Sequence, residues 1–196
     1  MNQVEQHIRE KLVTVKRAEV LSNALFSPEG LFGQLAHTEA ERRELVRTPL
    51  FRQAQARLSE LERNAADLLT AVKHDDVAGV KEALARGTDV DVTDYIGQTP
   101  LMWAVWQSNL FVVRTLIAAG ADVNARDVSG NTSFILASIR GEPCIVDALL
   151  PVADYRARDR EGMTALQHAE QHSNTEVARL LREHIAQSSP DAAIVR

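Results

Sequence analysis

The sequence predicts an all-α fold: a solenoid of helix-turn-helix units that follows an N-terminal helical extension. Three observations carry this prediction. Only 5% of the residues are aromatic, and Ala, Leu and Val abound, which favours helices over sheets. Three glycines recur at intervals of 33 and 32 residues, namely Gly97, Gly130 and Gly162. Between these glycines the apolar residues return with helical spacing.

Residues 1–64 precede the repeating pattern and are predicted to be helical. A first amphipathic helix is marked by apolar residues at Val4, Ile8, Leu12, Val15, Leu21 and Leu25, and it ends at residues 27–30. Residues 38–41 look like a capping box, and Thr48-Pro49 begins a further helix, with its apolar face at Leu50, Ala54, Leu58, Leu61 and Ala65. This region is either a cap on the open end of the stack or a separate element for binding or dimerisation.

The unit at residues 94–126 shows how one repeat is built. Thr99-Pro100 begins a helix, with Thr as the cap and Pro at the first helical position. Ser108-Asn109 separates it from a second helix, which Gly120 ends in the left-handed conformation. Neither helix can bury its apolar face alone, so the units must stack. We expect four units, at 65–93, 94–126, 127–158 and 159–186, and a disordered tail at 187–196.

The stretches TPLMWAV and GADVNARD, together with the 33-residue period, resemble the ankyrin repeat over about residues 65–185. The sequence also departs from the family pattern. The motif histidine is replaced by Met102, Ile135 and Gln167, and Pro151 stands where the turn after the third unit should contain glycine. The fourth unit is polar, as a terminal capping unit needs to be. The resemblance implies a non-catalytic module that binds a partner protein on its concave face.

Both tryptophans lie in the second unit, and the resemblance gives them different places. Trp103 is expected to be buried against the second helix, whereas Trp106 is expected on the concave face. Tyr95, Ile96 and Gln98 fall at the variable turn positions of the same unit. Large apolar side chains on a solvent face are characteristic of binding surfaces, and Trp, Tyr and Arg are common interface anchors.

The same register in the following units places arginines beside these apolar residues. The predicted partner-binding residues are Tyr95, Ile96, Gln98, Trp106, Gln107, Arg126, Ile139, Arg140, Arg158 and Arg160. If the arginines bind, the partner should present an acidic patch, because a guanidinium contacts a carboxylate through two hydrogen bonds. In the alternative interpretation the arginines are merely solvated and are neutralised by Asp127, Asp154, Asp159 and Glu161.

The sequence favours neither catalysis nor a cofactor. His168 and His172 are one helical turn apart, but the glutamate that a zincin motif needs after the first histidine is missing, so a metal binder or metal-dependent enzyme is a remote alternative. The single cysteine, Cys144, has no neighbouring histidine to activate it. The glycines are spaced by whole repeats and form no phosphate loop.

Charge and hydropathy bear on the class of partner and on where the protein is located. The formal net charge of −5 disfavours nucleic acid, and neither a signal peptide nor a membrane-spanning run is present in the sequence. We expect a cytoplasmic protein, or one exported by a route that leaves no N-terminal signal, and a monomer or a weak dimer formed through the N-terminal helices. Two uses of a protein-binding face remain open: an adaptor or scaffold, and an inhibitor or immunity-type protein that blocks a partner enzyme or toxin.

Overall fold

The computed structural model describes residues 6, 8, 10–12, 17–27, 29–35 and 45–188. These residues form helices, turns and a single isolated bridge between Arg158 and Thr164, and no strand occurs among them. The all-α prediction is therefore confirmed. The chain divides into two compact units, the first made of Met1–Leu68 with Glu82–Asp89 and the second of Leu69–Lys81 with Val90–Arg196.

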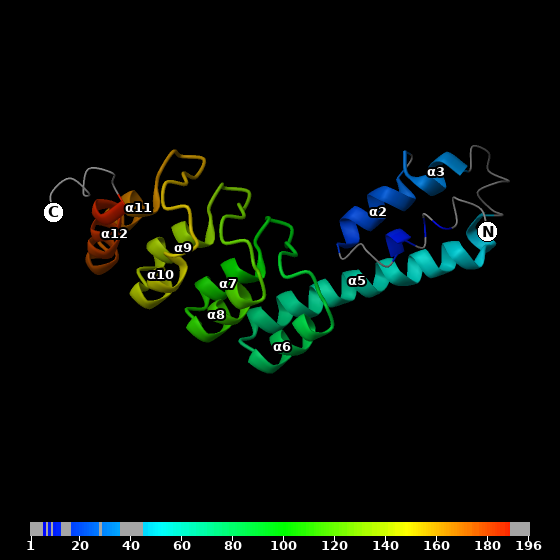
Figure 1. Ribbon diagram of the computed structural model, residues 1–196, viewed down its shortest axis with the longest axis horizontal. Coiled ribbons are helices and arrows are strands. Elements are labelled where there is room, and N and C mark those ends of the chain that lie inside the picture. The colour runs from blue at the N-terminus through cyan, green and yellow to red at the C-terminus, as the bar shows by residue number, and fades with distance from the viewer. Residues whose placement is uncertain are drawn as a thin grey trace. The chain divides into compact units, whose positions relative to one another are not determined.

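The helices follow one another along the chain as Figure 1 labels them. They are α2 (Ala18–Phe26), α3 (Leu31–Leu35), α5 (Pro49–Lys73), α6 (Val77–Ala85), α7 (Pro100–Trp106), α8 (Leu110–Ala118), α9 (Ser133–Arg140), α10 (Pro143–Leu149), α11 (Ala165–Gln171) and α12 (Thr175–Ser188).

The first unit has a hydrophobic core of its own. This core consists of Ile8, Leu12, Leu21, Leu25, Phe32, Phe51, Ala54 and Leu61. The rings of Phe26, Phe32 and Phe51 contact one another, with centroids 4.9 to 5.4 Å apart. The predicted first helix is not continuous, because Arg17 has an extended backbone and α2 begins after it. Val4, Val15 and the predicted capping box at 38–41 lie outside the described residues.

Helix α5 begins at Pro49, as predicted, and Thr48 caps it by accepting a hydrogen bond from the Phe51 amide at 3.2 Å. It then runs without a break to Lys73. The expected boundary between residues 64 and 65 therefore falls inside a single helix, because no residue between Pro49 and Lys73 breaks the helical pattern.

In the second unit, successive helix pairs pack side by side. Helix α7 contacts α8 and α9, α9 contacts α10 and α11, and α11 contacts α12, while α10 contacts both α8 and α12 (Figure 1). The core between them includes Leu101, Val105, Val113, Leu116, Phe134, Ile135, Ile145, Leu149, Ala169 and Leu181. Each pair thus buries its apolar stripe against its neighbours, as the repeat period predicts.

Local signals position each pair. Thr99, Thr132 and Thr164 cap α7, α9 and α11 by accepting a backbone N–H three residues on. Gly120 follows the end of α8 with φ of 88°, the left-handed conformation predicted for it. The turn at Pro151 forms without a left-handed residue, since the amides of Val152 and Ala153 both bond to the Leu149 carbonyl. Helix α12 continues to Ser188, two residues into the predicted tail, and residues 189–196 lie outside the described part.

Candidate partner-binding surface

Three β-turn-like hairpins precede α7, α9 and α11, and an aspartate organises each of them. Oδ1 of Asp94, Asp127 and Asp159 accepts two backbone N–H groups of its own hairpin, at 2.8 to 3.1 Å. Backbone hydrogen bonds then join neighbouring hairpins, from the Val128 amide to the Ile96 carbonyl and from the Arg160 amide to the Ser129 carbonyl. The hairpins are therefore held at fixed positions beside one another.

The second carboxylate oxygen ties two of these hairpins to their inner helices. Oδ2 of Asp94 accepts the indole N–H of Trp103 at 3.0 Å, and Oδ2 of Asp159 lies 2.6 Å from Nε2 of His168. Trp103 and His168 both follow their aspartate by nine residues. The expected burial of Trp103 is only partly correct, because its ring is half-buried with the Lys73 ammonium 4.2 Å from its centroid.

The Asp159 carboxyl is the titrating group that this geometry perturbs. Burial by itself raises its pKa, but the hydrogen bond from His168 and those from the amides of Met163 and Glu161 outweigh burial, so the pKa lies below its ordinary value. Asp159 therefore stays ionised and turned toward its own hairpin.

The predicted interface arginines differ from other arginines of the chain. Arg57, Arg179 and Arg182 each form an ion pair with a glutamate. Among the described residues, no carboxylate lies within ion-pair distance of Arg126, Arg140, Arg158 or Arg160, all of which are exposed. Asp127 and Asp159 face the amides of their own hairpins rather than these guanidiniums. The interpretation of the arginines as solvated side chains stays a hypothesis beside the binding one.

These four arginines have two kinds of environment. Arg126 and Arg158 donate to carbonyls of the hairpins. The Arg126 guanidinium donates to the carbonyls of Gly130 and Arg158. The Arg158 guanidinium donates to the Gly162 carbonyl. Arg140 donates to the Ser108 hydroxyl at 3.3 Å and lies 5.6 Å from the centroid of the Trp106 ring. The Arg160 guanidinium makes no hydrogen bond within the described structure. Arg140 and Arg160 consequently keep most of their N–H groups free.

Exposed apolar side chains lie among these arginines. Tyr95 is 92% exposed, Trp106 36% and Val128 49%. Val128 was missed by the sequence reasoning, although its register, one residue after the hairpin aspartate, matches that of Tyr95 and Arg160. Of the other predicted residues, Ile96 and Ile139 are half-buried and Gln98 is buried, because its backbone closes the hairpin on Asp94. Gln107 is exposed, and its amide donates to the Lys73 carbonyl.

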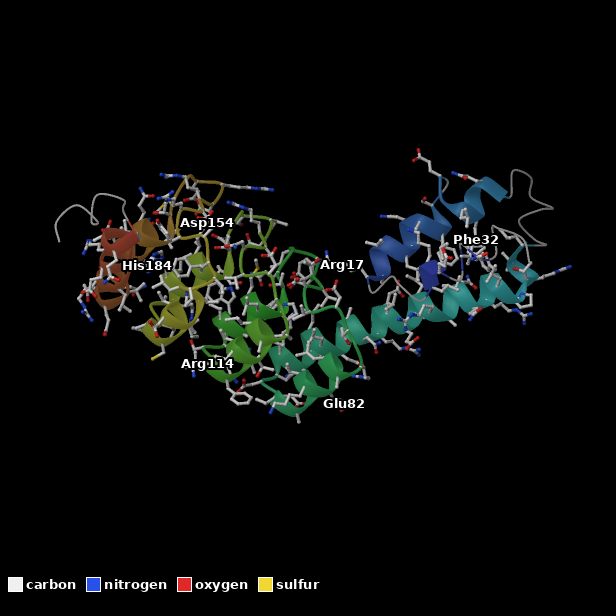
Figure 2. The ribbon with its side chains drawn as sticks, viewed as in Figure 1. Arg17, Phe32, Glu82, Arg114, Asp154 and His184 are labelled. Carbon is white, nitrogen blue, oxygen red and sulfur yellow. The ribbon has the colours of Figure 1, made fainter. Side chains whose placement is uncertain are left out.

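We call the surface formed by Tyr95, Trp106, Val128, Ile139, Arg140 and Arg160 the hairpin face. Its members come from three repeats, and two groups of them are in contact. The guanidinium of Arg140 reaches Trp106, and one pocket is lined by Val128, Ile139 and Arg160 together. Figure 2 shows the side chains that project from the hairpins, with Asp154 labelled on the loop between the third and fourth units and Arg114 labelled on α8, away from the hairpins.

The histidines form no recognisable metal centre. Nε2 of His168 is engaged by Asp159, and Nδ1 of His172 lies 3.0 Å from the His168 carbonyl. In the part of the chain that the structure describes, no three His, Cys, Asp or Glu side chains gather closely enough to hold a metal ion. None of the described helices combines the length and apolar character that crossing a bilayer requires.

The stacked helix pairs and the exposed hairpin face are those of a repeat protein. Residues 39–127 match the family model described as ankyrin repeats, in three copies. Residues 39–127 therefore contain ankyrin repeats, which generally serve as protein–protein interaction modules and are typically non-catalytic. The match starts before the predicted first unit and ends at residue 127, so the last two predicted units lie beyond it. No curated protein matches the chain.

Proposed function

We propose that the chain binds a partner protein through the hairpin face and that the partner presents carboxylates there. One observation carries this proposal: exposed arginines without ion-pair partners alternate with exposed apolar side chains on consecutive repeats. Other exposed arginines, such as Arg179 and Arg182 on α12, are paired with glutamates instead.

The charge arrangement at the hairpins supports an acidic partner. Asp94, Asp127 and Asp159 direct their oxygens at hairpin amides and inner side chains, so their lone pairs are occupied. The guanidiniums of Arg140 and Arg160 point to solvent with free donors. A partner carboxylate can therefore make bidentate contacts that none of the described residues supplies.

The same geometry reduces the entropy that binding costs. Arg140 packs against Trp106 and is held by Ser108, whose own hydroxyl donates to Glu142 at 2.8 Å. The backbone bonds between hairpins fix Tyr95 and Val128 relative to each other. Because these groups are ordered before a partner arrives, less conformational entropy is lost on binding.

The test begins with capture of a partner on the immobilised full chain and continues with surface plasmon resonance. Trp106→Ala should speed dissociation, weakening binding by about 2 kcal/mol or more. The double change Arg140→Glu, Arg160→Glu should slow association, most at low salt. Arg114→Glu, on the exposed side of α8, reverses a charge outside the hairpin face and is the control, which should leave both rates unchanged.

Two outcomes decide the proposal. Unchanged kinetics in the Trp106 and arginine variants would show that the partner docks elsewhere on the chain. If binding depends on these residues, the nature of the captured protein separates the two uses: an enzyme whose activity falls on binding would identify an inhibitor, whereas a partner that stays active would identify an adaptor.

A further inference from the structure

A pocket of about 340 Å³ lies between the hairpins of the third and fourth units. It is lined by Val128, Ser129, Asn131, Ile139, Asp159, Arg160, Glu161 and His168. Val128 and Ile139 supply its apolar wall, and Arg160 and Glu161 stand at its charged side. Asp159 keeps its negative charge, with hairpin amides donating to one of its oxygens and His168 beside the other, so that its oxygens are turned away from the Arg160 guanidinium.

The repeat register explains why the pocket opens at this place. Ile139 occupies the position that Trp106 has one unit earlier, and Val128 occupies the position of Tyr95. Aliphatic side chains thus stand where the preceding repeat carries aromatic rings. The smaller side chain of Ile139 leaves room between the last two hairpins, whereas the preceding inner position holds an indole that Arg140 covers. Tyr95 is 92% exposed, so its replacement by Val128 has little part in this difference.

Resting on the proposed function of this face, we propose that the pocket receives one aliphatic side chain of an acidic partner segment. Val128 and Ile139 would bury that side chain, and the free guanidinium of Arg160 would bind a carboxylate beside it. Arg140 follows Ile139 in the chain but does not line the pocket, and its guanidinium lies over the Trp106 ring, on the side of the second unit. The fitting ligand is an extended segment with an aliphatic residue between acidic ones.

The probes are three capped pentapeptides, titrated into the ¹⁵N-labelled full chain and followed by NMR. The first has a central leucine flanked by two glutamates on each side, the second replaces leucine with alanine, and the third replaces the glutamates with lysines. The leucine peptide should bind about tenfold more tightly than the alanine peptide, because it buries more apolar surface. The amides of Val128, Ile139 and Arg160 should shift.

The variants copy residues that the neighbouring repeat already holds at the same position. Ile139→Trp reproduces Trp106 and should fill the pocket, which would abolish the preference for leucine over alanine. Arg160→Val reproduces Val128 and should weaken both glutamate peptides alike, by about threefold, without changing that preference. If Ile139→Trp fails to fold, Ile139→Ala removes the apolar wall and should reduce the leucine preference in the same assay.

The outcomes separate this inference from the function on which it rests. Equal binding of the leucine and alanine peptides, a preference unaffected by either Ile139 variant, or no binding of any peptide would overturn the pocket. The lysine-flanked peptide could bind most tightly while the leucine peptide with glutamate flanks still binds more tightly than the alanine peptide. That result would contradict the acidic partner and leave the pocket supported. If the glutamate-flanked peptides show a preference for leucine over alanine and Ile139→Trp removes that preference, the pocket and the acidic partner are both supported.

Discussion

The junction between the second and third repeats and the junction between the third and fourth share a backbone design but present different surfaces. At the first, Trp106 lies under the Arg140 guanidinium, and Ser108 joins Arg140 to Glu142. At the second, Ile139 lines a pocket, and Asn174 donates to the carbonyls of Ser138 and Ile139. One junction closes its surface with side chains, and the other secures its backbone and leaves the surface hollow.

This difference shows which positions build the scaffold and which shape the binding surface. The hairpin aspartates and the capping threonines recur at every junction, because each satisfies backbone N–H groups that would otherwise lack partners. The positions of Trp106 and Ile139 satisfy no backbone group, so their size can change without disturbing the stack. Specificity can therefore vary from repeat to repeat on an unchanged frame.

The largest expected effect concerns the left-handed residues that end the inner helices. Gly141 has φ of 73°, and a Cβ there would lie 2.5 Å from Oδ1 of Asn174. Gly141→Ala should therefore displace the Asn174 amide from its two carbonyls and cost about 3 kcal/mol. Ser108 already holds the equivalent conformation with φ of 56°, so Ser108→Gly should change stability by less than about 1 kcal/mol.

Urea unfolding followed by circular dichroism measures both changes. Similar losses of unfolding free energy in the two variants would show that Asn174 can move freely. In that case the hydrogen bonds from Asn174 would not secure the backbone of the junction between the third and fourth repeats.

The two tryptophans give the next largest difference. Trp103 is half-buried and donates its indole N–H to Asp94, so Trp103→Ala should cost about 2 kcal/mol. Trp106 is exposed to 36%, and Trp106→Ala should cost less than about 1 kcal/mol. Thermal or urea unfolding of the two variants makes the comparison directly. A larger loss for Trp106 would mean that this side chain belongs to the scaffold.

Much of the frame could be predicted from the sequence because its signals are local. Thr99-Pro100, Asn109 and Gly120 place helix ends within a few residues, and the period carries them to the next units. The neighbouring positions of Trp106 and Arg140 followed from the same register. The break at Arg17 could not be foreseen, because the apolar spacing continues across it.

The finer features of the surface depend on residues that are distant in sequence. The pocket depends on the relative sizes of Val128 and Ile139 and on the hairpin that carries Arg160, which no local pattern encodes. The half-burial of Trp103 likewise depends on Lys73, thirty residues earlier. Register predicted which residues share a face, but side-chain packing between repeats determines which of them remain accessible.

A smaller effect should distinguish the fourth hairpin from the second by its response to pH. Asp159 has a folded pKa below its unfolded value of about 3.9, so its stabilising contribution is present above that value and is lost as the pH falls through the folded pKa. Asp159→Asn should cost about 1 kcal/mol at pH 7, and this difference should shrink as the pH falls through the folded pKa of Asp159. Unfolding free energies at several pH values test this, and a difference independent of pH would contradict it.

The smallest expected effect is the coupling between Trp106 and Arg140, which a double-mutant cycle measures. Trp106→Ile copies Ile139, the residue at the same position of the next repeat. Arg140→Gln removes the charge while keeping an amide that can still donate to Ser108. A guanidinium 5.6 Å from an exposed indole should give a coupling of about 0.5–1 kcal/mol in the four unfolding free energies. A coupling below about 0.3 kcal/mol lies within ordinary additivity. In that case the Trp106 ring would not hold the Arg140 guanidinium in place before binding. The junction between the second and third repeats would then be no better preorganised than the junction between the third and fourth.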